Sequence, residues 1–241
     1  FNLKIYLQNI MRTLYFVFCI IFSASLFAQK NIHHRWNTQL KKYVSNDGIV
    51  NYKEWGKNID QLKAYINTLE SNPPNENTSK EYKLAYWINA YNALTIDLII
   101  KNYPLKSIKE IKFPWKTKCF NDGKNNYSLG DIEHKILRKM NEPRIHFAIN
   151  CASKSCPKLL NEAYIEKNLN NQLNAATKEF LIDSTKNIIK ENKSMLSKIF
   201  LWFGKDFGSK KMIKEFISEY SGVKFNKFRI DYMPYNWDLN E

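Results

Sequence analysis

Two cysteines, two histidines and several small polar residues lie close together in the middle of the sequence. Cys151 and Cys156 are five residues apart, and His134, His146 and Asn150 precede them. A thiolate beside an imidazole, with an acid or amide that orients the imidazole, is what nucleophilic catalysis by cysteine requires. The sequence therefore predicts a functional site in this part of the chain.

The stretch from Pro143 to Pro157 is predicted to begin as a strand and to end as a tight polar loop. Its first residues alternate with a period of two, which is typical of a half-buried strand. One face then carries Ile145, Phe147 and Ile149, and the other carries His146 and Asn150. Loops at strand ends often hold functional residues, so the loop that contains Cys151 is the expected centre of the site.

The first hypothesis is a thiol-dependent hydrolase or acyl transferase with Cys151 as its nucleophile. His146 lies five residues back on the expected strand and should face away from Cys151. His134, on the preceding helix, is then the preferred base, with Glu133 or Asn150 to orient it. All four histidines precede Cys151, which excludes the papain-like order of cysteine before histidine.

Two alternatives use the same residues. A non-catalytic binding or structural module could hold a Cys151–Cys156 disulfide, with Cys119 as the spare thiol, or Cys119 could pair with Cys156 and leave Cys151 free. The third hypothesis is a zinc site made of His134, His146, Cys151 and Cys156, although the spacing matches no strong zinc pattern. We therefore expect neither a metal nor another cofactor.

Asn89 and Asn92 lie in the longest apolar segment, Glu81 to Tyr103, which is predicted to be a buried helix. Residues three apart share a helix face, and a buried amide needs partners. The two amides are expected to hold an irregular segment, for which the cysteine loop is the natural candidate. With Asn150 and Ser153 of that loop, they form the expected support of the site.

The remaining patterns predict a helix-rich α+β fold with a small, mainly antiparallel sheet. Helices are expected over residues 33–44, 58–69, 81–103, 129–140, 163–182, 195–203 and 211–220. Ser128 and Asp131 should form a capping box. A hairpin is expected between residues 119 and 127, and short strands at 188–189 and 228–232. One globular domain covering residues 29–241 accommodates all of these elements.

Residues 1–28 are expected to lie outside that domain. After Met11 and Arg12 come an apolar run and a small-residue exit at Ala28, which is the pattern of a secretory signal peptide. The protein is therefore expected to be exported, to the periplasm or beyond the cell. No later segment is apolar enough to cross a membrane.

The net charge of +14 comes from lysines that are scattered along the chain. Nucleic-acid binding would require a basic stripe or aromatic residues interleaved with basic ones, and neither pattern occurs. The expected partner is instead a small-molecule, peptide or acyl substrate.

Four motifs together resemble the family called domain of unknown function 547. They are Tyr86-Trp87-Ile88-Asn89-Ala90-Tyr91-Asn92-Ala93-Leu94, Leu129-Gly130-Asp131-Ile132-Glu133-His134, His146-Phe147-Ala148-Ile149-Asn150-Cys151-Ala152-Ser153 and Tyr235-Asn236-Trp237-Asp238-Leu239-Asn240. The resemblance implies a shared fold and a shared site, and it brings no catalytic assignment with it.

Overall fold

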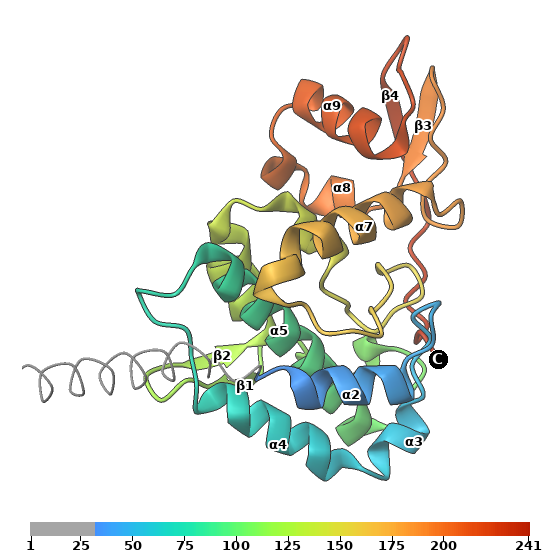
Figure 1. Ribbon diagram of the computed structural model, residues 1–241. Coiled ribbons are helices and arrows are strands. Elements are labelled where there is room, and N and C mark those ends of the chain that lie inside the picture. Colours follow the sequence, from blue (N-terminus) through green and yellow to red (C-terminus); the bar gives the residue numbers. More distant parts are fainter. Residues whose placement is uncertain (1–31) are drawn as a thin grey trace, which may run out of the picture. The chain divides into compact units, whose positions relative to one another are not determined.

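Helix α5, Lys80–Asn102, is the buried centre around which the other elements pack (Figure 1). The computed structural model describes residues 32–241, so the predicted signal segment lies outside the described residues. Ser79 caps α5 by accepting a hydrogen bond from the backbone N–H of Tyr82. Both sides of α5 are buried, as its continuous apolar sequence predicts.

Shorter helices and strands surround α5, and the expected helix-rich α+β fold is confirmed. The other α-helices are α2 His34–Tyr43, α3 Tyr52–Gly56, α4 Ile59–Glu70, α6 Leu129–Asp131, α7 Leu169–Ile182, α8 Ile199–Trp202 and α9 Lys210–Ser221. Turns of 3-10 helix cover Ile108–Glu110, Leu137–Met140, Pro143–Phe147, Glu166–Asn168 and Gly204–Phe207, and Ile132–Ile136 is a π-helix.

Two separate strand pairs make up the sheet structure of the described residues. Strands β1, Lys118–Asn121, and β2, Asn126–Ser128, form the expected antiparallel hairpin. Strands β3, Lys193–Leu196, and β4, Arg229–Tyr232, are parallel. A parallel pair needs a long crossover, which α8 and α9 provide between the two strands.

The predicted strand at the start of the Pro143–Pro157 stretch is wrong. Pro143–Phe147 is a 3-10 helix, with Pro143 in its first turn and the Glu142 side chain accepting from the backbone N–H of Arg144. The alternation was misleading because both sets of side chains are buried, His146 included. A buried helical turn carries buried residues on every side. An alternation of residue types in such a turn therefore does not separate a buried face from an exposed one and does not indicate a strand.

Three further elements differ from the sequence prediction. The expected helix over 195–203 is instead the end of β3 followed by the single turn α8, and Ile188 forms only an isolated bridge with Met195. The helix expected over 129–140 begins with the predicted capping box, in which Ser128 and Asp131 bond each other's backbone N–H. It then continues as π-helix and 3-10 helix instead of regular α-helix.

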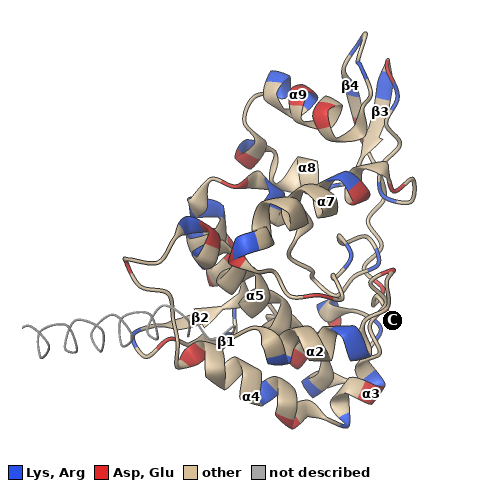
Figure 2. Cartoon of the chain, in the orientation of Figure 1, with Lys and Arg blue, Asp and Glu red and all other residues tan. Residues whose placement is uncertain are grey.

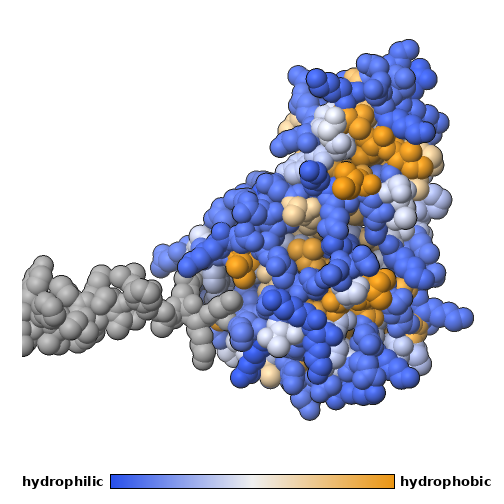
Figure 3. Space-filling model, turned by 45° about the vertical axis from the view of Figure 1, so that its right-hand side comes forward, coloured by the Kyte–Doolittle hydropathy of each residue, from blue (hydrophilic) through white to orange (hydrophobic). Residues whose placement is uncertain are grey.

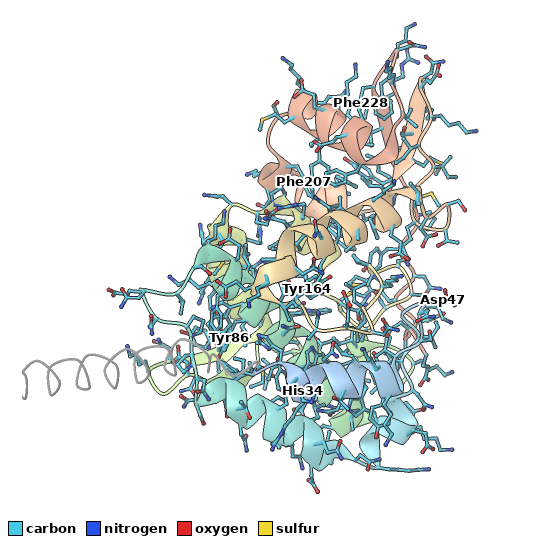
Figure 4. All side chains as sticks on the ribbon, viewed as in Figure 1. His34, Asp47, Tyr86, Tyr164, Phe207 and Phe228 are labelled. Carbon is cyan, nitrogen blue, oxygen red and sulfur yellow. The ribbon has the colours of Figure 1, made fainter. Side chains whose placement is uncertain are left out.

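Aromatic residues form the core on both sides of α5 within the compact unit His33–Glu241. Beneath α2, Trp36 stacks on Tyr65 with ring centroids 5.4 Å apart. In the C-terminal part, Phe147 contacts Phe180 of α7 at 5.1 Å and Phe207 at 5.8 Å. Phe207 lies in the region between α7 and α9 in Figure 4. Phe147 thus anchors the 3-10 helix before the cysteines in the C-terminal core.

After β4, the chain runs back past the cysteine loop and ends beside α3 (Figure 1). Backbone bonds join this C-terminal segment, residues 233–241, to three other loops: Lys154 N to Asp238 O at 2.8 Å, Leu239 N to Lys106 O at 2.9 Å and Val50 N to Asn240 O at 2.8 Å. The Tyr52 hydroxyl also donates to Asn240 Oδ1 at 2.7 Å. The C-terminal segment therefore holds the cysteine loop from outside.

Figure 2 shows Lys and Arg spread over most elements, with Asp and Glu interspersed among them. Figure 3 shows apolar residues gathered in patches on a mainly hydrophilic face. Among residues 32–241, no helix combines the length and the apolar character needed to cross a membrane.

The side-chain amides of Asn89 and Asn92 on α5 each bond one backbone carbonyl and one backbone N–H of a loop that packs on the helix. Asn89 Nδ2 donates to the carbonyl of Tyr164 at 2.7 Å, and Asn89 Oδ1 accepts from the N–H of Tyr164 at 3.0 Å. Asn92 Nδ2 donates to the carbonyl of Ala148 at 3.0 Å, and its Oδ1 accepts from the N–H of Asn150 at 2.9 Å. Of the two amides, Asn92 is therefore the one that binds the cysteine stretch.

Replacing Asn92 with alanine should lower the free energy of unfolding by about 2–4 kcal/mol, because it leaves a buried N–H and a buried carbonyl without partners. Urea denaturation of the purified variant measures this change. Asn102→Ala is the matched control on the same helix: its exposed amide bonds only Leu98 of its own helix, so the loss should stay below about 0.5 kcal/mol. Equal losses in the two variants would contradict the role of Asn92.

Candidate active site

Cys151 and Cys156 face each other across a tight loop. Both are free cysteines, and their sulfur atoms are 2.6 Å apart. The backbone N–H of Cys151 also donates to Cys156 Sγ at 3.0 Å. Cys151 is half-buried and Cys156 is buried, whereas Cys119 is exposed. The two sulfur atoms thus form a dithiol pair in which Cys151 is the more accessible member.

The loop between the cysteines is closed by the side chain of Asn150. Asn150 Oδ1 accepts from the N–H of Ala152 at 2.7 Å, and Nδ2 donates to the carbonyl of Pro157 at 2.7 Å. Ala152 is fully buried and has a φ of 59°, in the left-handed region that non-glycine residues rarely adopt. Such strain persists only where surrounding contacts enforce it, and here it turns Cys151 back towards Cys156.

Two hydroxyl groups complete the surroundings of Cys151. Its sulfur lies 3.2 Å from Ser153 Oγ and 3.4 Å from the hydroxyl of Tyr235. Ser153 Oγ donates to the Tyr235 hydroxyl at 3.1 Å, which leaves the tyrosine proton free to point at the sulfur. Sequence reasoning missed Tyr235 as a site residue. Its signal was the closing motif from Tyr235 to Asn240, which the C-terminal segment brings to the loop.

The two thiols have different proton affinities. The hydrogen bond with Cys156, together with burial, raises the pKa of Cys151 well above its usual value. Burial alone would raise the pKa of Cys156 as well, but hydrogen bonds from the side chain and backbone of Cys151 outweigh it and lower that pKa. The pair therefore releases its protons in two separate steps, and the first thiolate forms on Cys156.

Glu133 is a buried carboxyl group in the same cavity. Burial, and then the nearby Cys151, raise the pKa of Glu133 to about 7. The hydroxyl of Tyr91 donates to Glu133 Oε2 at 3.3 Å. A carboxyl group with a pKa near 7 can both accept and release a proton at neutral pH.

The two histidines belong to a separate polar network. His146 Nε2 lies 2.8 Å from Asp206 Oδ2, and burial lowers the pKa of His146 to about 4. His134 Nδ1 lies 3.2 Å from Arg138 Nη1, and burial and Arg138 lower the pKa of His134. Arg138 binds Asp206 with two nitrogens, at 2.5 and 2.8 Å. Within residues 32–241, neither imidazole forms a hydrogen bond with Cys151.

These groups line one cavity of about 250 Å³. It brings together Glu133, His134, His146, Cys151 and Cys156 from the predicted site, whereas Asn89, Asn92, Asn150 and Ser153 lie behind its wall. The rest of its lining is mainly apolar: Tyr91, Trp115, Ile149, Pro157, Ile199, Trp202, Phe203, Tyr235 and Trp237. Among the described residues, no three His, Cys, Asp or Glu side chains are grouped to hold a metal ion, so the four residues of the zinc hypothesis do not form such a site.

The raised pKa of Glu133 predicts a pH-dependent cost to stability. The folded protein holds this proton more tightly than the unfolded chain, whose carboxyl has the ordinary value of 4.5, so stability falls as the pH rises from 4.5 to about 7. A Glu133→Gln variant lacks this dependence. Its free energy of unfolding relative to the native protein should rise by about 3 kcal/mol over that range and level off above it.

Urea denaturation at several pH values measures this difference, and Glu142→Gln serves as the contrasting control. Burial would raise the pKa of Glu142, but its hydrogen bonds with Arg144 outweigh burial and lower that pKa. The native Glu142 therefore stabilises the protein above its unfolded-state pKa, and this stabilisation is lost as the pH falls. A Glu133→Gln difference that is flat from pH 4.5 to 7 would contradict the assignment.

Comparison with known proteins supports the resemblance found in the motifs. Residues 75–181 match the family described as "Protein of unknown function, DUF547". No curated protein and no solved structure matches the chain. The matched residues contain three of the four motifs, and the fourth lies in the C-terminal segment that packs on them. Residues 75–181 of the chain are therefore similar to the domain of unknown function 547 family, in agreement with the motifs.

Proposed function

We propose that this protein carries out thiol–disulfide exchange, with Cys151 and Cys156 as its reactive pair. The observation that carries the proposal is the distance of 2.6 Å between the two sulfur atoms in the wall of a cavity. Disulfide exchange requires one accessible thiol that meets the substrate and a second thiol that can reach the first. Cys151 and Cys156 fit these two roles by their exposure and their separation.

The hydrogen bonds of the cysteine loop favour this chemistry over acyl transfer. Acyl transfer needs backbone N–H groups that are free to stabilise an oxyanion. In this loop the N–H groups of all residues from 150 to 156 except Ser153 already have acceptors. Asn150 N bonds Asn92 Oδ1, Cys151 N bonds Cys156 Sγ, Ala152 N bonds Asn150 Oδ1, and Lys154 N, Ser155 N and Cys156 N bond the carbonyls of Asp238, Asn236 and Ser153. The bonded loop is suited to holding two sulfurs together.

In the proposed reaction, Cys151 attacks one sulfur of a substrate disulfide and passes its proton to the Cys156 thiolate. A bond forms between Cys151 Sγ and the substrate sulfur, and the other substrate sulfur leaves as a thiolate. Cys156 then loses its proton and attacks Cys151 Sγ, which releases the second substrate thiolate and leaves a Cys151–Cys156 disulfide. The substrate gains two electrons, and an external thiol such as glutathione restores the dithiol.

Glu133 is the proposed proton acceptor for the second step. It lines the same cavity as both sulfurs, and the charge of Cys151 contributes to its raised pKa. The base that removes the proton from Cys156 must be deprotonated in part of the molecules near pH 7. The pKa of about 7 gives Glu133 this property. Protonated Glu133 can also deliver a proton to the leaving thiolate.

Hydrolysis or acyl transfer at Cys151 is a second candidate. Glu133 favours it, because a carboxylate in the same cavity could take the proton of Cys151 directly. A purely structural disulfide would use the same two cysteines and would not turn over. All three functions suit the exported protein that we propose from the signal-like residues 11–28. They differ in what happens to Cys156 during the reaction.

The test uses a Cys119→Ser background and a peptide that contains a disulfide, with glutathione as reductant. We expect turnover of the peptide disulfide, and we expect mass spectrometry to show reversible loss of two hydrogens from the Cys151–Cys156 pair. Cys151→Ser should abolish turnover. Cys156→Ser should also abolish it and should accumulate a mixed disulfide on Cys151, because the resolving thiol is missing.

The alternatives give different results in the same experiment. A disulfide that forms once and is not reduced by glutathione would establish the structural function. An acyl adduct on Cys151 with an activated ester, which forms equally in Cys156→Ser, would establish the second candidate. Full turnover of the peptide disulfide in Cys156→Ser would contradict the role of Cys156 as the resolving thiol. Circular dichroism of each variant verifies that it is folded.

Closing the pair should also stabilise the protein modestly. A disulfide across so short a loop adds about 2 kcal/mol on the chain-entropy model. Urea denaturation of the oxidised and reduced forms measures this difference. A markedly less stable oxidised form would show that the loop cannot accept the bond and would contradict the proposed reaction.

A further inference from the structure

A cluster of four aromatic side chains begins at the reactive sulfur and extends to the surface. Tyr235, whose hydroxyl is 3.4 Å from Cys151 Sγ, packs on Trp237 with ring centroids 4.6 Å apart. Trp202 of α8 contacts both rings, at 4.8 and 5.8 Å, and Trp115 contacts Trp237 at 6.0 Å. We call these four residues the aromatic wall. Three distant segments of the chain contribute to it.

The wall is fixed at Trp115 through its backbone, although part of the wall faces solvent. The backbone carbonyl of Trp115 accepts from the N–H of Gly130 at 3.0 Å, and a Cβ at position 130 would lie only 2.7 Å from that oxygen. Trp202 is nonetheless 44% exposed, and its neighbour Leu201 is 51% exposed. Ordered aromatic surface beside a reactive group is typical of a binding site for an apolar ligand.

Among the described residues that line the cavity, no lysine or arginine supplies a positive charge. Arg138 is paired with Asp206, and burial lowers the pKa of His134 and of His146. Glu133 is half-protonated near its pKa of about 7. An anionic ligand group would therefore lose its hydration without gaining a counter-charge from the lining, which is unfavourable. The cavity favours a neutral ligand group.

The size of the cavity limits what it can hold. Its volume of about 250 Å³ is below the range of roughly 300–1,000 Å³ that is typical for whole drug-sized ligands. One bulky group next to the reacting sulfur fits this space, while the rest of a substrate would extend past Trp202 into solvent.

We propose that the aromatic wall selects the substrate, and that the substrate is a disulfide whose reactive sulfur is flanked by one neutral aromatic or bulky apolar group. This inference rests on the proposed function, since it places that group on Trp202 and Tyr235 while Cys151 reacts. Stacking of aromatic groups contributes about 0.5–1.5 kcal/mol beyond area burial. Trp202 is then the specificity-determining residue at the entrance.

The test compares maleimides that share one reactive ring and differ only in the substituent on nitrogen. In each reaction Cys151 passes its proton to the Cys156 thiolate and its sulfur adds to the carbon–carbon double bond, so that a carbon–sulfur bond forms and the neighbouring carbon takes up a proton. The probes are N-methylmaleimide, N-benzylmaleimide and N-carboxyethylmaleimide, applied to the reduced protein in the Cys119→Ser background. Peptide mapping follows the rate at Cys151, and glutathione gives the intrinsic rate of each probe.

After division by the glutathione rates, the benzyl probe should react about 2- to 10-fold faster than the methyl probe, which corresponds to the stacking energy. The carboxyethyl probe should react more slowly than the methyl probe. Trp202→Ala should remove the preference for the benzyl group, and Trp202→Phe should retain most of it. Leu201→Ala is the matched control, because Leu201 is the more exposed neighbour and does not line the cavity.

Equal normalised rates for the benzyl and methyl probes would overturn the inference, and so would a preference that survives in Trp202→Ala. Neither result affects the redox behaviour of the cysteine pair, which is measured separately by the reversible loss of two hydrogens. Failure of the inference is therefore distinguishable from failure of the proposed function. Circular dichroism and urea denaturation of Trp202→Ala verify that the fold is intact.

Discussion

The side chain of Asn150 is the interaction on which the site depends. The backbone N–H of Asn150 bonds Asn92 on the buried helix α5. The side-chain amide of Asn150 closes the cysteine loop by bonding Ala152 and Pro157. An amide can accept and donate at once, so this one side chain binds two backbone groups, Ala152 N–H and the Pro157 carbonyl, that have no strand to pair with. This closure holds Ala152 in its left-handed conformation and brings the two sulfur atoms together.

The electrostatics of the cavity follow from burial combined with a few specific bonds. Burial raises the pKa of Glu133 to about 7 and lowers the pKa of His146 to about 4, whereas the thiols influence each other because they are in contact. His146 is engaged with Asp206 instead of Cys151. The cysteine pair and the histidine network therefore occupy the same cavity without a direct hydrogen bond, which distinguishes this site from a cysteine–histidine dyad.

The C-terminal segment connects the site to the rest of the fold. Its backbone bonds to residues near Val50, Lys106 and Lys154 fix the position of Tyr235 and Trp237 beside the cysteines. Trp115 and Trp202 then pack on those two rings from other segments. Because the aromatic wall is assembled from distant parts of the chain, its geometry depends on the tertiary structure as a whole.

The sequence by itself determined the elements that depend on local patterns. Continuous apolar residues specified buried α5, the Ser128–Asp131 pattern specified a capping box, and the turn residues after Cys119 specified a hairpin. It also placed Cys151, Cys156 and Glu133 in one short stretch. The sequence did not predict the 3-10 helix Pro143–Phe147 correctly, because a short run that is buried on all sides has no exposed face by which a strand and a helix could be distinguished. Only the tertiary structure paired the sulfurs, bonded His146 to Asp206 and brought Tyr235 to Cys151, because each of these contacts requires a folded loop or joins residues far apart in the chain.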